Sequence, residues 1–101
     1  MHITTDESGQ TLTLAGPLEI AVAEELCSAL RDLLERAPHP TLDLSQVEAV
    51  DAAALQVLCS ARKTAERDGK RLEIAAISPA VRNKSEALGL SLADLGASDG
   101  I

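Results

Sequence analysis

One stretch in the middle of the 101-residue chain holds the residues whose types and spacing could do chemistry. An apolar strand pattern over residues 41–44 carries Asp43, and a predicted loop over residues 45–50 leads to a second acid, Asp51. Asp51 stands directly before an alanine-rich helix pattern. A carboxylate there can accept hydrogen bonds from free backbone N–H groups and oppose the positive end of the helix dipole. The stretch therefore predicts a capped helix start that a partner could contact.

No catalytic set accompanies this junction, because no hydroxyl, thiol, imidazole or glycine-rich turn follows Asp51. Cys27 and Cys59 lie in helix patterns without a nearby base, so we expect two reduced thiols that act as small core residues. His2 and His39 have no metal-ligand spacing to each other or to the cysteines. The sequence predicts a protein that is not an enzyme and that carries no cofactor or metal.

Composition narrows the class of partner. The net charge is −7, and the chain has no Trp, Tyr or Phe. An acidic surface repels phosphate backbones, and bases have no aromatic side chains on which to stack, so nucleic acid is excluded as a partner. The core must be aliphatic. No apolar run is long enough for a membrane span, and the first residues lack a signal-peptide pattern, so we expect a cytoplasmic protein without direct membrane insertion.

Seven segments have the periodicity of regular structure. Strand patterns alternate apolar and polar residues, and helix patterns repeat apolar residues at three- and four-residue steps. Turn and breaker residues, among them the Gly16-Pro17 pair, separate the segments. The predicted strands are residues 2–5, 11–15, 41–44 and 72–75, and the predicted helices are residues 21–37, 52–68 and 79–88.

The order of these segments predicts an α/β fold. An opening hairpin followed by alternating helices and strands implies βαβ crossovers, hence a mixed four- to five-stranded sheet with helices packed mainly on one face. We expect a single domain over residues 1–95, with Leu90, Leu92 and Leu95 in helical rhythm, and a frayed tail over residues 96–101. The first strand or the hairpin edge could pair with a second copy to give a homodimer.

Four motifs in this order resemble the STAS domain, the fold of bacterial anti-sigma-factor antagonists. The likeness runs from the first strand to the third helix. The motifs are Gly16-x-Leu18-x-Ile20, Leu42-Asp-Leu-Ser-x-Val47, Val50-Asp51-x-Ala53-x-Leu55, and Ser78-Pro-Ala-Val81 leading to Leu88-Gly-Leu90.

The resemblance implies a regulatory module that docks an anti-sigma kinase-like protein. In that family a Ser or Thr commonly follows the aspartate, and its phosphorylation by the partner controls association. A phosphate at a helix start would be held by backbone N–H groups and would disrupt a partner surface by charge. The matching residue here is Ala52, so the phospho-acceptor is absent. The partner-binding residues that the resemblance implies are Asp43, Ser45, Asp51, Ala52, Ala53 and Leu55.

Several alternatives stay open. Asp51 is either a plain helix cap or also a recognition carboxylate, and Ser45 is a loop serine or a substitute phospho-acceptor. Ser60 and Thr64 lie within a helix, where access for a kinase requires that they face solvent. The resemblance also allows a subunit bound to the ATPase of a lipid-transporting ABC complex, or a component of chemotaxis signalling. A nucleotide sensor is disfavoured, because no glycine-rich phosphate loop or basic cluster is visible.

Overall fold

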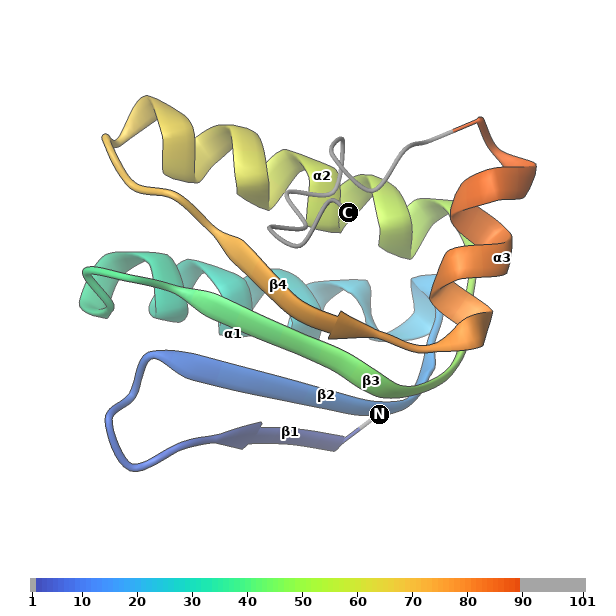
Figure 1. The fold of residues 1–101 in the computed structure, drawn as a ribbon, viewed down its shortest axis with the longest axis horizontal. Helices are drawn as coiled ribbons and strands as arrows, with labels where there is room; N and C mark the ends of the chain where they lie inside the picture. The colour runs from blue at the N-terminus through green and yellow to red at the C-terminus, as the bar shows by residue number, and fades with distance from the viewer. Residues whose placement is uncertain (1, 90–101) are drawn as a thin grey trace.

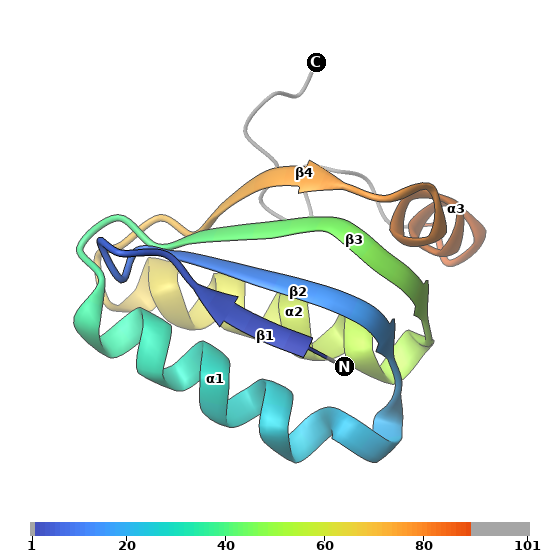
Figure 2. The same cartoon turned by 90° about the horizontal axis from the view of Figure 1, so that it is seen from below.

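The computed structural model describes residues 2–89 and shows a sheet covered on one face by two helices (Figures 1 and 2). The regular elements follow the order expected from the sequence. In chain order they are β1 (His2–Thr5), β2 (Thr11–Leu18), the 3-10 helix η1 (Ile20–Val22), α1 (Ala23–Arg36), β3 (Thr41–Val50), α2 (Ala52–Arg67), β4 (Glu73–Ile77) and α3 (Pro79–Ala87).

The sheet is mixed, as predicted. Its strand order is β1-β2-β3-β4, with β1 antiparallel to β2 and the other two pairs, β2–β3 and β3–β4, parallel. Figure 2 shows α1 and α2 side by side below the sheet, while α3 lies at one end, beside β3. Each parallel pair is joined by one of these helices, as a crossover between parallel strands requires. The predicted α/β architecture is confirmed, and the described residues form four strands.

The core between sheet and helices is built from aliphatic side chains. Period-two alternation turns Leu12 and Leu14 of β2, and Leu42 and Leu44 of β3, toward the helices. Four leucines of α1 and five residues of α2 cover them. Because the chain has no aromatic residue, close packing of aliphatic side chains, most of them leucines, fills the described core.

Two strands, β2 and β3, are longer than the sequence pattern predicted. β2 passes through Gly16 and Pro17 to Leu18, and β3 runs ten residues to Val50 where we predicted four and then a loop. Relative to β2, β3 carries one extra residue at Ser45 and another at Glu48, and each marks a β-bulge. The bulges break the alternation that signals a strand, so the predicted loop over residues 45–50 was wrong. Gly16, with φ +82°, takes a conformation that other residues rarely adopt.

Cys27 also corrects a prediction, because its side chain is exposed and is not a core residue. It follows buried Leu26 by one position, which on a helix is a rotation of about 100° away from the core. Cys59 is half-buried and packs against the core, which agrees with its predicted place.

Four predictions concern the C-terminal part of the chain. The third helix is observed as Pro79–Ala87, with the Ser78 hydroxyl accepting a hydrogen bond from the Val81 N–H at 3.3 Å, as the Ser-Pro signal predicts. The helical rhythm of residues 90–95, the domain limit at residue 95 and the frayed tail over residues 96–101 lie outside the described residues. Across residues 2–89, no helix combines the length and hydropathy needed to span a bilayer.

The β1–β2 turn is organised by the Asp6 carboxylate. The backbone N–H groups of Thr11 and Gln10 each donate to Asp6 Oδ1 at 3.1 Å, and the Ser8 hydroxyl donates to the same carboxylate. These hydrogen bonds hold the pKa of Asp6 below its usual range, with the Thr11 N–H as the largest cause and the Ser8 hydroxyl and Gln10 N–H as smaller ones. Hydrogen bonds to the charged form favour that form.

We expect Asp6→Asn to lower stability at neutral pH and to have no effect at strongly acidic pH. A carboxyl whose pKa is depressed by folding stabilises the folded state above its unfolded pKa, and that contribution is lost as the pH falls through the folded pKa. The free energy of unfolding of both proteins, measured from pH 7 to pH 2, checks this. Glu7→Gln removes the same charge one residue away and is the control; an equal pH dependence in both variants would contradict the role of Asp6.

Candidate functional site

The candidate site is the first turn of α2, at the end of the sheet where β2 and β3 finish (Figure 1). The chain leaves β3 at Val50 and enters α2 at Ala52, so Asp51 is the only residue between the two elements. The Asp51 N–H donates to the Leu18 carbonyl oxygen at 3.1 Å, which ties the start of α2 to the end of β2. The sheet therefore fixes the position of this helix start.

Asp51 is the N-cap of α2, as predicted. Its backbone is extended, and its Oδ1 atom accepts a hydrogen bond from the Ala54 N–H at 2.9 Å. An N-cap carboxylate satisfies one of the free donors of the first turn and interacts favourably with the helix dipole. The next two residues, Ala52 and Ala53, are half-buried and leave part of their surface accessible to a partner.

Leu55 does not belong to this surface. The resemblance implied it as a partner-binding residue, but its side chain has 0% exposed surface and forms part of the core. It follows Ala52 by three positions in the helix, and the α2 residues that turn toward the sheet include its neighbours Ala54 and Leu58. Leu55 can affect the site only by holding α2 in place.

Asp43 and Ser45 lie together, away from Asp51. The Ser45 hydroxyl donates to Asp43 Oδ1 at 2.6 Å, and the Ser45 N–H donates to the same oxygen at 2.9 Å. Both residues lie in the middle of β3, where Asp43 is paired with Thr13 and Ala76. Ser45 and Asp51 are six positions apart along an extended, bulged path, or at most about 20 Å. The predicted set thus divides into two places, and only Asp51, Ala52 and Ala53 form the start of α2.

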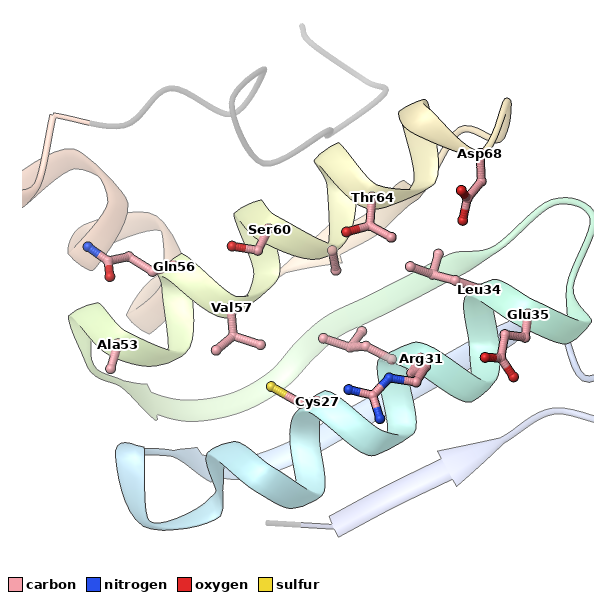
Figure 3. A pocket seen from close by; sticks show the side chains of 12 residues that line it. Cys27, Arg31, Leu34, Glu35, Ala53, Gln56, Val57, Ser60, Thr64 and Asp68 are labelled. Atoms are coloured by element: carbon pink, nitrogen blue, oxygen red, sulfur yellow. The ribbon is translucent and has the colours of Figure 1, made fainter.

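A groove between α1 and α2 opens beside this first turn, and the sequence analysis did not identify it. Figure 3 shows Ala53 and Cys27 at one end and Glu35 and Asp68 at the other. The groove has a volume of about 600 Å³. The sequence did contain a signal for this groove. It is a row of small side chains along α2 that lies opposite a row of α1 containing leucines. The lining residues are Cys27, Leu30, Arg31, Leu34, Glu35, Ala53, Gln56, Val57, Ser60, Ala61, Thr64 and Asp68.

Charge is distributed unevenly around the site. Residues 2–30 and 37–61 contain no Lys or Arg, and these ranges include the first halves of both α1 and α2. Exposed Glu24 and Glu25 lie in the first turn of α1, and exposed Glu48 lies in β3 just before the site. A cluster of acidic side chains attracts a partner that has a basic surface and repels a partner that has an acidic surface.

The residues at the start of α2 do not form a set of catalytic side chains. Asp51 is engaged with the backbone of its own helix, and Ala52 and Ala53 carry no reactive group. Within residues 2–89, no three His, Cys, Asp or Glu side chains are placed to hold a metal ion together.

We expect Asp51→Ala to destabilise the protein by about 1 kcal/mol, because the Ala54 N–H loses its acceptor. Asp51→Ser is the matched control, since a serine oxygen can accept the same hydrogen bond and should recover most of the stability. Urea unfolding followed by far-UV circular dichroism measures both. Equal stability of the alanine variant and the unchanged protein would mean that the cap makes no net contribution.

Comparison with known proteins identifies the fold and the family. The chain matches a family model described as "Mlab, STAS domain" over residues 1–94, and no curated protein matches its sequence. Fifteen solved chains match it in structure. One is a candidate anti-sigma factor antagonist from Thermotoga maritima, 18% identical with a TM-score of 0.66, which covers 87% of this chain and 77% of that one.

A second solved structure, described as Mglu, is 23% identical with a TM-score of 0.63. The match covers 77% of this chain but 20% of that one, so the shared part is one domain of a larger protein. At these identities the two structures support the fold. The family model spans nearly the whole sequence and confirms the resemblance seen in the four motifs, and the chain therefore belongs to the STAS domain family.

Proposed function

We propose that this chain is a non-enzymatic module that binds a regulatory protein through the first turn of α2. The observation that carries the proposal is the geometry of this turn. Asp51 caps the helix, and Ala52 and Ala53 lie half-buried at the end of the sheet, where no large side chain of their own keeps a partner away. The family of the chain, typically made of non-catalytic binding modules, supports the same function.

The partner that fits best is an anti-sigma kinase-like protein, with release of a sigma factor by competition. Ala52 has no hydroxyl, so the partner cannot transfer a phosphate to that residue. The module would then remain competent to bind at all times, and control would come from its amount or from the partner. Asp43 and Ser45 would form a separate surface on β3, and Leu55 would support the site from the core.

A binding and phosphorylation assay with a purified anti-sigma kinase and ATP tests the proposal. We expect a stable complex and no phosphate incorporated into the module. Ser45 is the exposed hydroxyl nearest to the site in sequence, so Ser45→Ala is the informative variant. The proposal would be contradicted if phosphate is found on Ser45 and changes the affinity for the partner, and if Ser45→Ala removes that phosphate.

A constitutive subunit of a larger complex is the second candidate. The absence of a hydroxyl at Ala52 favours it, since a permanent subunit needs no phosphate switch. The partner would be the ATPase of a lipid-transporting ABC complex, bound through the same first turn of α2. Co-purification with such an ATPase from native membranes would support this candidate, and capture of an anti-sigma kinase would support the first.

A further inference from the structure

We propose that the groove between α1 and α2 binds a basic amphipathic helix of the partner protein. This inference rests on the proposed function, because the groove shares Ala53 with the first turn of α2 and so continues the same surface. It goes further by assigning a second contact region and the chemistry of the segment that fills it.

The shape of the groove fits one row of side chains. Its α2 wall runs from Ala53 to Asp68, a rise of about 22 Å in a helix. The α1 wall is shorter, from Cys27 to Glu35, or about 12 Å. A volume of about 600 Å³ over these lengths leaves a mean cross-section of roughly 27–50 Å², too narrow for a whole helix but wide enough for one ridge of side chains. Helix pairs pack by placing such ridges into grooves, with residues at three- and four-residue steps. A helix of about fifteen residues would match the length.

Apolar side chains line the floor of the groove. Leu30 and Leu34 of α1 and Val57 and Ala61 of α2 line the groove. Figure 3 shows Leu34 on α1 and Val57 on α2. Polar rims flank this floor, with Gln56, Ser60 and Thr64 on the α2 side. The occupant therefore needs an apolar row that meets the floor and polar side chains on both sides of it, which is the pattern of an amphipathic helix.

Acidic side chains lie at both ends of the groove. Glu35 and Asp68 line one end. At the other end, exposed Glu24 precedes Cys27 by three positions, which places it on the same side of α1. Among the described residues that line the groove, Arg31, midway along α1, is the only basic one. At the end that holds Glu35 and Asp68, the Lys70 ammonium is bound to the Leu34 carbonyl oxygen and offsets part of the negative charge. A helix with basic residues beyond each end of its apolar row complements this arrangement, whereas a second copy of this chain, at net charge −7, is repelled.

Cys27 gives a native probe of occupancy. It is exposed at the groove, while Cys59 is half-buried and does not line it. Alkylation rates of the two thiols, resolved by mass spectrometry of the digested protein, report on each site. The probe ligand is a synthetic 18-residue helical peptide with leucine along one face and lysine on the other. Its counterpart has glutamate in place of every lysine.

We expect the lysine peptide at saturation to slow alkylation of Cys27 at least fivefold, and the glutamate peptide to leave the rate unchanged. Ser60→Trp fills the groove and should abolish the protection, whereas Asn83→Trp on α3 should preserve it, because Asn83 does not line the groove. Glu35→Lys should weaken peptide binding at least threefold at low salt. Asp32→Lys, the same change at an exposed position outside the groove, should weaken it less.

Four outcomes would overturn the proposal. They are equal protection by both peptides, protection that survives Ser60→Trp, protection by dodecanoate alone, and protection that rises with protein concentration in the absence of peptide. Dodecanoate would indicate a site for a small amphiphile, and concentration dependence would indicate a second copy. The assay contains no natural partner, so its failure would leave the proposed function standing if Ala52→Asp still disrupts binding of the regulatory protein.

Discussion

Replacing Ala52 by aspartate is expected to weaken binding of the regulatory partner at least about tenfold, or ~1.4 kcal/mol, without unfolding the protein. Ala52 is the first residue of α2 and is half-buried next to the Asp51 cap. An acidic side chain in a first helical turn interacts favourably with the helix dipole, so the fold should tolerate it. In a complex, however, the new carboxylate would lose water and lie beside other acids, and both effects oppose binding.

Ala52→Asn separates charge from size, because asparagine has nearly the same shape and no charge. Its affinity should remain within about threefold of the unchanged protein if the aspartate acts by charge and desolvation, as a phosphate would. Titration calorimetry with the purified partner measures both affinities, and far-UV circular dichroism verifies the fold. Equal affinity of the aspartate variant and the unchanged protein would place the interface elsewhere on the molecule.

Leu58→Ala has the largest expected effect on stability, about 2–5 kcal/mol. Leu58 is 2% exposed, belongs to the core and projects from the middle of α2. Replacing its isobutyl group by a methyl group takes away apolar contacts and leaves a cavity under the helix that carries the candidate site. A domain of this size has about 5–15 kcal/mol of stability in total, so the variant loses a large part of it.

Lys63→Ala, at an exposed position on the same helix, is the control and should change the free energy of unfolding by less than about 0.5 kcal/mol. The chain has no Trp, Tyr or Phe, so far-UV circular dichroism must replace fluorescence in the thermal and urea unfolding experiments. Each kcal/mol corresponds to about 4–8 °C in Tm for a domain of this size. A fall in Tm no larger than that of Lys63→Ala would mean that α2 repacks without cost.

The candidate site was predicted in part from the sequence. Asp51 could be identified because a helix cap is a local interaction, set by one side chain and the backbone three residues later. Ser45 and Asp43 belong to the motif that precedes Asp51 and were grouped with it, yet the extended path of β3 separates them from it. Leu55 was predicted to meet a partner and is buried, because the rotation of a helix against its sheet depends on distant residues.

The extent of the strands shows the same limit. The alternation of Leu42 and Leu44 predicted the first part of β3. The second part was missed, since the bulges at Ser45 and Glu48 place two polar or small residues in succession on the strand. Such a segment has no alternation of its own. It becomes a strand because β2 lies alongside and supplies backbone hydrogen-bond partners as far as Leu18.

The sequence by itself indicated the family through four motifs in order, and the stretch from Asp43 to Leu55 determined the capped start of α2 and the absence of a hydroxyl at Ala52. These properties depend on residue type and on neighbours within one turn or one motif. Only the tertiary structure decided that β3 continues to the cap and that Leu55 faces the core. It also decided that Cys27, Ala53 and Asp68 line one groove, because packing of α1 against α2 brings together residues that are far apart in the chain.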